Sequence, residues 1–170
     1  MAKPQATSAT RFSDFGLTLV ERVFRRCPPY VAWRVMASLL RASGLRLGKT
    51  SVFWGMPTFS GAGQVSALLT IGEHCGFNLG CHFEVDDEIV IEDHVSVGHQ
   101  VMFLTRRKTS GDTAPIRVGA GAWLGSRSVV MPGVTIGAGA VVGAAAVITE
   151  DVPPNVLISG GRKISLAKWR

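Results

Sequence analysis

Hydrophobic residues recur in this chain at intervals of six, a period that fits neither an α-helix nor an ordinary alternating strand. The period runs in two blocks: Leu47, Phe53, Phe59, Val65, Ile71, Phe77 and Phe83, then Val118, Leu124, Val130, Ile136, Val142 and Ile148. A six-residue period held over this much chain is typical of a parallel β-helix, in which each repeat supplies one short strand and one corner. The sequence therefore predicts a narrow prism with these side chains inside.

Small residues follow the same period in the second block. Two positions before each hydrophobic residue stand Ala122, Ser128, Val134, Ala140 and Ala146, so bulky and small side chains alternate toward the interior. Gly121, Gly133 and Gly139 fall where the chain must turn sharply, and glycine allows such turns without a steric cost.

Two interruptions break the period in the middle of the chain. Ile91 follows Phe83 by eight residues, which predicts a two-residue bulge between residues 85 and 89. Fifteen residues separate Phe103 from Val118, and the polar stretch 105–115 between them predicts a loop outside the prism. Such loops on repeat scaffolds often carry function.

Three repeats in each coil would stack outward side chains in columns. This phasing places His82, Met102 and Trp123 in one outer column. It also stacks Asn78 on Gly98 of the next coil, beside His99.

The first 44 residues differ from the repeats at 45–170. Residues 13–26 and 30–42 each predict a short helix, the first ending before Pro28 and the second carrying apolar residues at helical spacing. Because solenoids need covered ends, we interpret these helices as a cap on the prism. The alternative is peripheral contact, with basic helices lying on a membrane surface.

Composition limits the cellular setting and the partners. Three cysteines with no metal-type spacing, no signal peptide and no long apolar run predict a cytoplasmic protein with free thiols, and Cys75 and Cys81 fit small residues stacked in the prism. The net charge of +6 favours anionic partners such as cofactor phosphates, an acidic glycan or a membrane surface. No nucleic-acid motif is visible, so a nucleic-acid partner is not expected.

Residues 115–126, continuing through Val130-Met-Pro-Gly to Asn155, closely resemble the hexapeptide-repeat acyltransferases. Within that family the chain looks most like the maltose, galactoside and exopolysaccharide O-acetyltransferases. The resemblance implies an all-β fold, a left-handed parallel β-helix, assembled as a homotrimer. It also implies acetyl-CoA as donor in a groove between subunits, a sugar or glycan acceptor, and no metal.

The resemblance also assigns roles to residues. Trp123 matches a tryptophan beside the reactive end of CoA, and the backbone groups of Ser126 and Ala144 match contacts to the pantetheine arm. Lys163 stands approximately where a basic residue meets the nucleotide phosphates. For the acceptor, Asn78 matches an asparagine that holds the sugar. Glu84 replaces the usual aspartate and could accept hydrogen bonds from sugar hydroxyls.

The chain departs from the family at the catalytic base. Direct acyl transfer needs a base for the acceptor hydroxyl, and histidine suits neutral pH. The family usually carries this histidine shortly after a Leu-Thr pair, but here Leu104-Thr105 is followed by Arg106-Arg107-Lys108. Arginine cannot act as a base, and lysine would need strong desolvation.

Two histidines remain as candidates for the base. His99 follows Gly98, the residue on which Asn78 is predicted to stack. His82 shares the predicted outer column with Trp123. The third reading is that no histidine is catalytic.

The leading hypothesis is an acetyl-CoA-dependent transferase acting on a sugar hydroxyl or amine, with acetyl or a longer acyl group left open. One alternative is a non-catalytic CoA-binding or scaffold trimer, because the loop histidine is missing. The other is a zinc protein like the γ-type carbonic anhydrases, whose site needs three histidines. His94 and His99 have the five-residue separation, but the pattern Gly-His-x4-His would need a histidine where Leu104 stands.

Overall fold

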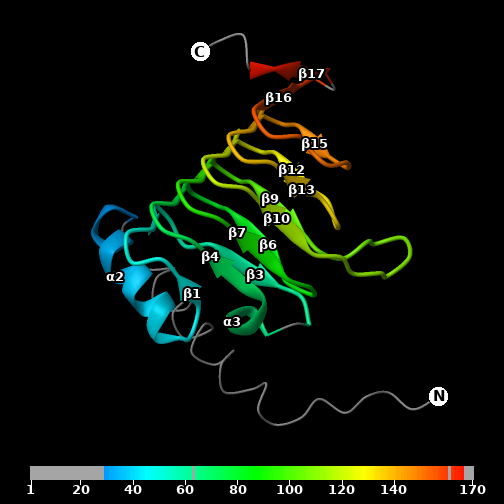
Figure 1. Ribbon diagram of the computed structural model, residues 1–170. Coiled ribbons are helices and arrows are strands. Elements are labelled where there is room, and N and C mark those ends of the chain that lie inside the picture. Colours follow the sequence, from blue (N-terminus) through cyan, green and yellow to red (C-terminus); the bar gives the residue numbers. More distant parts are fainter. Residues whose placement is uncertain (1–28, 63, 161, 167–170) are drawn as a thin grey trace, which may run out of the picture.

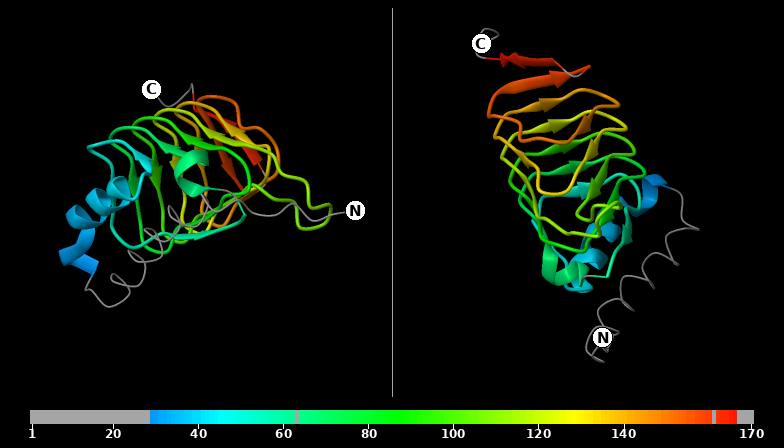
Figure 2. Two further views of the ribbon diagram at one scale, coloured as in Figure 1. Left: turned by 90° about the horizontal axis from the view of Figure 1, so that it is seen from below. Right: turned by 90° about the vertical axis from the view of Figure 1, so that its right-hand side faces the viewer.

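The chain folds into a parallel β-helix, which the computed structural model shows as coils stacked along one long axis (Figure 1). The structure describes residues 29–62, 64–160 and 162–166. Each complete coil contributes three short strands, one to each side of a prism, as the views along and across the stack show (Figure 2). The fold predicted from the period of six is confirmed.

Three sheets form the sides of the prism. The first contains β1 (Arg46–Leu47), β4 (Leu69–Ile71), β7 (Ile89–Ile91), β10 (Ile116–Val118) and β13 (Thr135–Ile136). The second contains β2 (Val52–Phe53), β5 (Gly76–Phe77), β8 (Ser96–Val97), β11 (Trp123–Leu124), β14 (Val141–Val142), β16 (Val156–Ser159) and β17 (Arg162–Ser165). The third contains β3 (Thr58–Ser60), β6 (His82–Glu84), β9 (Met102–Leu104), β12 (Val129–Val130) and β15 (Val147–Ile148).

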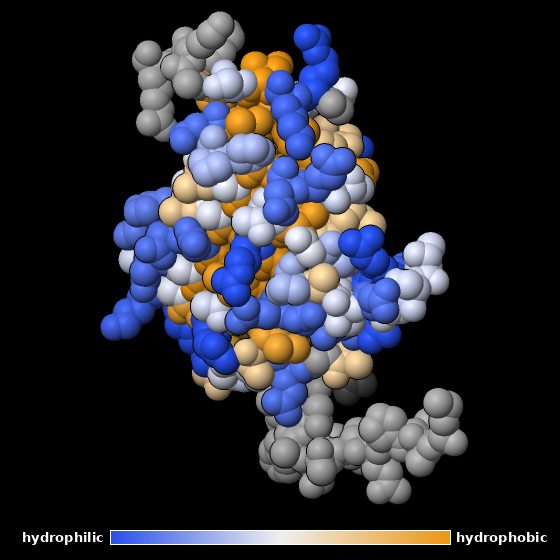
Figure 3. Space-filling model, turned by 45° about the vertical axis from the view of Figure 1, so that its right-hand side comes forward, coloured by the Kyte–Doolittle hydropathy of each residue, from blue (hydrophilic) through white to orange (hydrophobic). Residues whose placement is uncertain are grey.

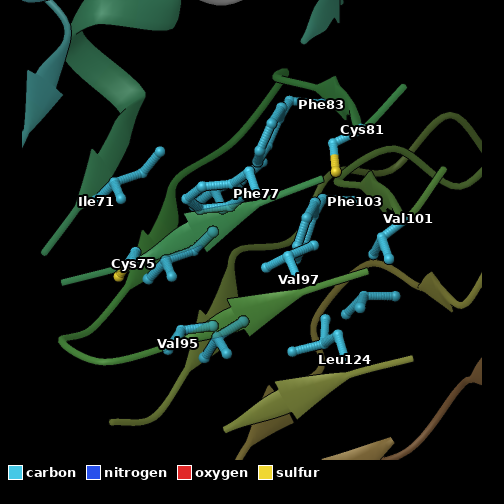
Figure 4. Packing of buried hydrophobic residues seen from close by; sticks show 14 of the residues in the cluster. Ile71, Cys75, Phe77, Cys81, Phe83, Val95, Val97, Val101, Phe103 and Leu124 are labelled. Carbon is cyan, nitrogen blue, oxygen red and sulfur yellow. The ribbon is translucent and has the colours of Figure 1, made fainter. Parts of the chain in front are cut away.

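The parallel register stacks the inward residues of one coil on those of the next. Phe53 pairs with Phe77, and their rings stack with centroids 4.5 Å apart. Phe83 pairs with Phe103, and these rings stack at 4.9 Å with an angle of 6° between their planes (Figure 4). All four rings are fully buried, so aromatic ladders fill the first half of the prism.

Both described cysteines belong to this interior. Cys75 and Cys81 are free thiols and are buried (Figure 4). Burial raises the pKa of Cys75, and it raises the pKa of Cys81 to about 11. They therefore act as small core residues, as the sequence indicated, and their thiolate forms are disfavoured.

The predicted corner glycines adopt the backbone conformation that glycine favours. The φ angles of Gly121, Gly133 and Gly139 are 68°, 84° and 64°. Between the first and second sheets, His74 and His94 hold the same kind of position with φ of 56° and 60°. The corner geometry therefore persists even in coils that lack the glycine.

Helix α2 (Pro29–Ala42) packs against β1 and β2 at the N-terminal end of the prism (Figure 1). Met36, Ala37 and Leu40 are buried, so this helix covers the end of the core. The helix predicted at 30–42 is confirmed, whereas the one predicted at 13–26 lies outside the described residues. Within the described residues, no helix is both long and apolar enough to cross a membrane.

One of the predicted strand positions is wrong. Val65 lies in the short helix α3 (Val65–Leu68), which is inserted between the first and second coils. The strands β1, β2 and β3 complete the first coil at Ser60. The next strand, β4, begins at Leu69 and already belongs to the first sheet, so the prism has no strand between them. The side chain of Val65 is still buried, which explains why it keeps the hydrophobic period.

The predicted interruptions both occur where the period breaks. Residues 85–88 form a longer turn between β6 and β7. The stretch 105–115, here called the projecting loop, leaves the prism between β9 and β10 and doubles back on itself (Figure 1). An antiparallel bridge joins Arg106 to Thr113, and the N–H of Arg107 donates to the carbonyl of Asp112 at 2.8 Å.

Candidate active site

An open groove of about 690 Å³ runs along the corner between the second and third sheets. It spans four successive coils, because each coil contributes two neighbouring residues from the same corner position. The lining residues are Leu79, Gly80, His99, Gln100, Ser126, Arg127, Ala144 and Ala145. The structure therefore brings three of the predicted site residues, His99, Ser126 and Ala144, into one groove, here called the corner groove.

His99 is held in the groove by its backbone. Its N–H donates to Oγ of Ser126 at 3.2 Å, and its carbonyl accepts from the N–H of Arg127 at 2.7 Å. These bonds fix the backbone between two coils. The His99 residue is exposed and lines the groove, so a ligand in the groove can reach it.

Close packing of the coils forms the wall beside His99. A Cβ on Gly98 would lie 2.6 Å from the backbone nitrogen of Ser126, and one on Gly125 would lie 2.5 Å from that of Ala144. Glycine is required at both positions. Within the described part of the chain, the N–H groups of Ser126 and Ala144 donate to no protein acceptor. They are available to an extended ligand with carbonyl groups.

Sequence reasoning missed the other polar side chains of the corner groove. Arg127 and Gln100 lie on neighbouring coils, and Nε of Arg127 donates to Oε1 of Gln100 at 3.0 Å. Their φ angles are 62° and 56°, and Gly80 and Ala145 hold the equivalent positions at 76° and 57°. Aligning the coils on these corner positions would have exposed both side chains.

His82 does not line the corner groove. It lies on β6, where Nδ1 contacts Oγ1 of Thr58 at 2.7 Å and Nε2 contacts Oγ of Ser60 at 3.0 Å. Both ring nitrogens therefore have hydroxyl partners from β3. The imidazole could act as a base only after giving up one of these bonds.

The predicted outer column is confirmed for His82 and Met102 and is wrong for Trp123. His82 pairs with Met102 in the third sheet, but Trp123 pairs with Ser96 and Val141 in the second. The projecting loop adds residues without adding strands, so counting repeats across it assigned Trp123 to the wrong side. The indole is 57% exposed and is not among the residues lining the corner groove.

Asn78 and Lys163 flank the corner groove without lining it. Asn78 follows β5 directly before Leu79, and the register of β5 with β8 places it next to Gly98, as predicted. Its Nδ2 donates to the carbonyl of Val97 at 3.4 Å. Lys163 lies on β17 beside a smaller hollow formed with β15, and its Nζ is 3.4 Å from Oε2 of Glu150.

Glu84 lies at the root of the projecting loop rather than in an open site. The residue is 6% exposed, and Lys108 of the loop pairs with Oε1. Within the described residues, the other oxygen, Oε2, is buried and has no hydrogen-bond partner. The loop residue that stands near the family's usual base position therefore forms an ion pair with the predicted acceptor-binding carboxylate.

A second ion pair fixes the same loop. Nη2 of Arg106 donates to Oδ1 of Asp86 at 2.9 Å, and this bond lowers the pKa of Asp86. The hydroxyl of Thr105 accepts from the N–H of Asp86 at 2.8 Å and donates to the carbonyl of Glu84 at 2.7 Å. The root of the loop is thus tied to the turn after β6.

The histidines do not converge on a metal. His94 stacks on His74 at the corner between the first and second sheets, with ring centroids 4.8 Å apart, whereas His99 lies at the next corner. Among the residues that the structure describes, no group of three or more His, Cys, Asp or Glu side chains could hold a metal ion. The spacing of His94 and His99 therefore does not translate into a shared site.

Comparisons with known proteins agree with the repeats and the fold. The family model of the bacterial transferase hexapeptide, with six repeats, matches residues 115–150. Galactoside O-acetyltransferase of Escherichia coli strain K12 is 38% identical over 79 residues, which are 45% of this chain and 39% of that protein. The chain thus matches less than half the length of this curated relative.

Solved structures match over most of the chain. A hexapeptide-repeat acetyltransferase of Vibrio cholerae, complexed with acetyl-CoA, has a TM-score of 0.76 at 23% identity, covering 96% of this chain and 90% of that one. A maltose O-acetyltransferase of Clostridium difficile 630 has a TM-score of 0.71 at 23% identity, covering 94% and 88%. The chain therefore carries hexapeptide repeats like those of bacterial transferases over residues 115–150, and it shares the fold of these solved acetyltransferases.

Proposed function

We propose that this protein is a CoA-dependent acyltransferase that moves an acetyl group from acetyl-CoA to a hydroxyl or amine of a sugar or glycan. The observation that carries the proposal is the corner groove, where the accessible imidazole of His99 lies beside two N–H groups that have no protein acceptor. The relatives named as galactoside and maltose O-acetyltransferases support the sugar acceptor. The neighbour complexed with acetyl-CoA supports the donor.

The corner groove suits the donor along its length. The N–H groups of Ser126 and Ala144, which line the groove, would bind the amide carbonyls of the pantetheine arm. Lys163 lies beyond the Ala144 end, beside β15, where a cation would meet the nucleotide phosphates. Trp123 on β11 would contact the reactive end from the second sheet.

His99 then acts as the general base. It removes the proton from the acceptor hydroxyl, and the oxygen attacks the thioester carbonyl carbon. The tetrahedral intermediate collapses with cleavage of the carbon–sulfur bond, and the imidazolium returns the proton to the CoA sulfur. The products are the acetylated sugar and free CoA, and backbone N–H groups would stabilise the oxyanion.

His99 is preferred to His82 because of what each ring contacts. Both nitrogens of His82 have hydroxyl partners on β3, whereas His99 lines the corner groove itself. A general base must lie within reach of the proton that it removes, so the location of each histidine decides which one is the better candidate.

Acceptor binding is assigned to Asn78 and Glu84. Asn78 lies one residue from the groove, and its carboxamide oxygen could accept from a sugar hydroxyl. Glu84 keeps this role only as an expectation from the resemblance, because its carboxylate is buried and paired with Lys108.

A homotrimer is part of the proposal. Among the residues that the structure describes, six large hydrophobic side chains are exposed: Trp54, Leu79, Met102, Trp123, Val147 and Ile164. Figure 3 shows hydrophobic residues in a band along the long axis, with hydrophilic residues on both sides. Burying such a band between copies of the chain would stabilise an assembly. A cytoplasmic location and membrane contact through the N-terminal helices stay predictions.

Matched substitutions at two exposed alanines test the donor site. Ala144→Phe should fill the corner groove and weaken acetyl-CoA binding about 10-fold or more, measured by calorimetry, through lost groove volume. Ala138→Phe is the control, because Ala138 is also exposed and belongs to the same coil but lies at the corner between the first and second sheets. Equal affinity in both variants would place the donor elsewhere.

A non-catalytic CoA-binding trimer is the second candidate function. The observation that favours it is the ion pair between Lys108 and Glu84, which occupies the region of the family's usual base. Acetyl-CoA binding without release of CoA thiol, over a panel of neutral and acidic sugars, would support this candidate and reject transfer to those sugars.

A further inference from the structure

The guanidinium of Arg127 is a cation in the corner groove, and no carboxylate of the described residues pairs with it. Its Nε donates to Oε1 of Gln100, and within the described residues its two Nη atoms have no protein acceptor. Arg106, Lys108, Arg117 and Lys163 each pair with a carboxylate, and Arg41 and Arg46 donate to backbone carbonyls instead. None of the residues lining the corner groove is acidic.

The backbone at Arg127 is unfavourable for arginine. Its φ angle of 62° lies in the left-handed region, where glycine and asparagine are favoured and other residues cost about 1 kcal/mol. The bond from its N–H to the carbonyl of His99 holds it there. The same φ recurs at the equivalent corner residues Gln100 and Ala145, so the coil geometry fixes the backbone that carries this exposed side chain into the lining of the groove.

The contact with Gln100 orients the guanidinium. Because Nε is already occupied, the Nη edge is the part that remains for a ligand. Two parallel N–H donors on that edge match the two oxygens of a carboxylate or phosphate.

We propose that Arg127 binds an anionic group on the acceptor, so that the preferred acceptor is an acidic sugar carrying a carboxylate or a phosphate. This inference rests on the proposed transferase function. Arg127 is bonded through its backbone to His99, the assigned base, whereas Lys163 lies past the far end of the groove. Arg127 is therefore joined directly to the residue assigned to the acceptor proton, whereas the residue assigned to the nucleotide phosphates lines a different hollow.

The experiment compares matched sugars with the intact protein. Methyl β-D-glucuronide, glucose 6-phosphate and methyl β-D-glucoside are offered with acetyl-CoA, and CoA thiol release is measured. An acidic sugar should have a kcat/KM about 10-fold or more above the neutral glucoside. Arg127→Gln should remove that preference mainly through KM, while Arg127→Lys should keep part of it.

Arg117→Gln is the control, because Arg117 is an exposed arginine on β10 that pairs with Glu88 away from the groove. It should leave the preference unchanged. Thermal unfolding of each variant shows whether it is folded.

Binding without turnover separates this inference from the proposed function. Ligand-detected NMR with CoA present should show the acidic sugars binding to the wild type and not to Arg127→Gln. Such binding with no transfer to any sugar would reject the transferase and keep the anion site. The assignment would be overturned if acidic and neutral sugars bound equally, or if neither bound. It would also be overturned if Arg127→Gln lost only affinity for CoA, which would mean that Arg127 binds the CoA phosphates.

Discussion

The backbone N–H of Arg127 donates to the carbonyl of His99 at 2.7 Å, joining two groove residues that are 28 positions apart in sequence. The bond belongs to the ladder between adjacent coils, which lie about 4.8 Å apart. The relative position of these two side chains is therefore set by the β-helix and not by a mobile loop. A substitution at either side chain should leave the other in place.

Replacing Arg127 by glycine should stabilise the protein while removing the anion-binding group. Glycine relieves the left-handed φ at this corner, so the free energy of unfolding should rise by about 0.5–1 kcal/mol. Urea unfolding measures the change. Arg117→Gly, within β10, should lower stability instead. A loss of stability in Arg127→Gly would show that its side-chain contacts outweigh backbone strain.

Truncating the aromatic ladder should be costly. The ring of Phe83 is fully buried and stacks on Phe103, so Phe83→Ala should lower the free energy of unfolding by about 3–5 kcal/mol. Phe59→Ala should cost less, because Phe59 is only partly buried. Chemical denaturation compares the two. Similar costs would mean that the core relaxes around the missing ring.

The pair between Glu84 and Lys108 should show strong coupling. Lys108→Met leaves a buried carboxylate without its cation and should destabilise the fold by about 1–3 kcal/mol. Adding Glu84→Gln removes the charge and should recover part of that loss. A double-mutant cycle by thermal unfolding measures the interaction, and purely additive effects would contradict it.

The pair between Asp86 and Arg106 should stabilise the fold at neutral pH and not in acid. The hydrogen bond from Arg106 lowers the pKa of Asp86 in the folded protein. The pair therefore contributes its full stabilisation above the pKa of an unfolded aspartate, about 3.9. This stabilisation is lost as the pH falls through the lower pKa of Asp86 in the folded protein. Asp86→Asn should be less stable than the wild type at pH 7, by about 1 kcal/mol. That difference should fade below about pH 4.

Unfolding measured across pH checks this prediction. A difference between Asp86→Asn and the wild type that is constant from pH 7 down to strong acid would contradict it. Arg106→Gln should follow the same pH profile as Asp86→Asn.

The period of six was enough to predict the β-helix, because each inward residue repeats under the same packing constraint. It failed at Val65 and at the column of Trp123 for one physical reason. Both insertions add residues without adding a prism strand: α3 keeps the period through the buried Val65, and the projecting loop shifts the count of strands.

The site was predictable only where it follows the coils. His99, Ser126 and Ala144 share a corner position in successive coils, and all three line the groove. Arg127 was missed because the hydrophobic period marks the inward residues, whereas Arg127 is an exposed residue at a corner. The pair between Lys108 and Glu84 was missed because it joins a loop to a strand, and hydrophobic spacing does not describe such a contact.

The central claim is that His99 in the corner groove is the base for acyl transfer. The most direct measurement is the rate of CoA release from acetyl-CoA in the presence of a sugar acceptor, compared between wild type and His99→Ala. We predict a fall in kcat of about 10²- to 10⁴-fold with acetyl-CoA affinity nearly unchanged, and a much smaller effect for His82→Ala. A His99→Ala variant that keeps a rate close to wild type would contradict the account.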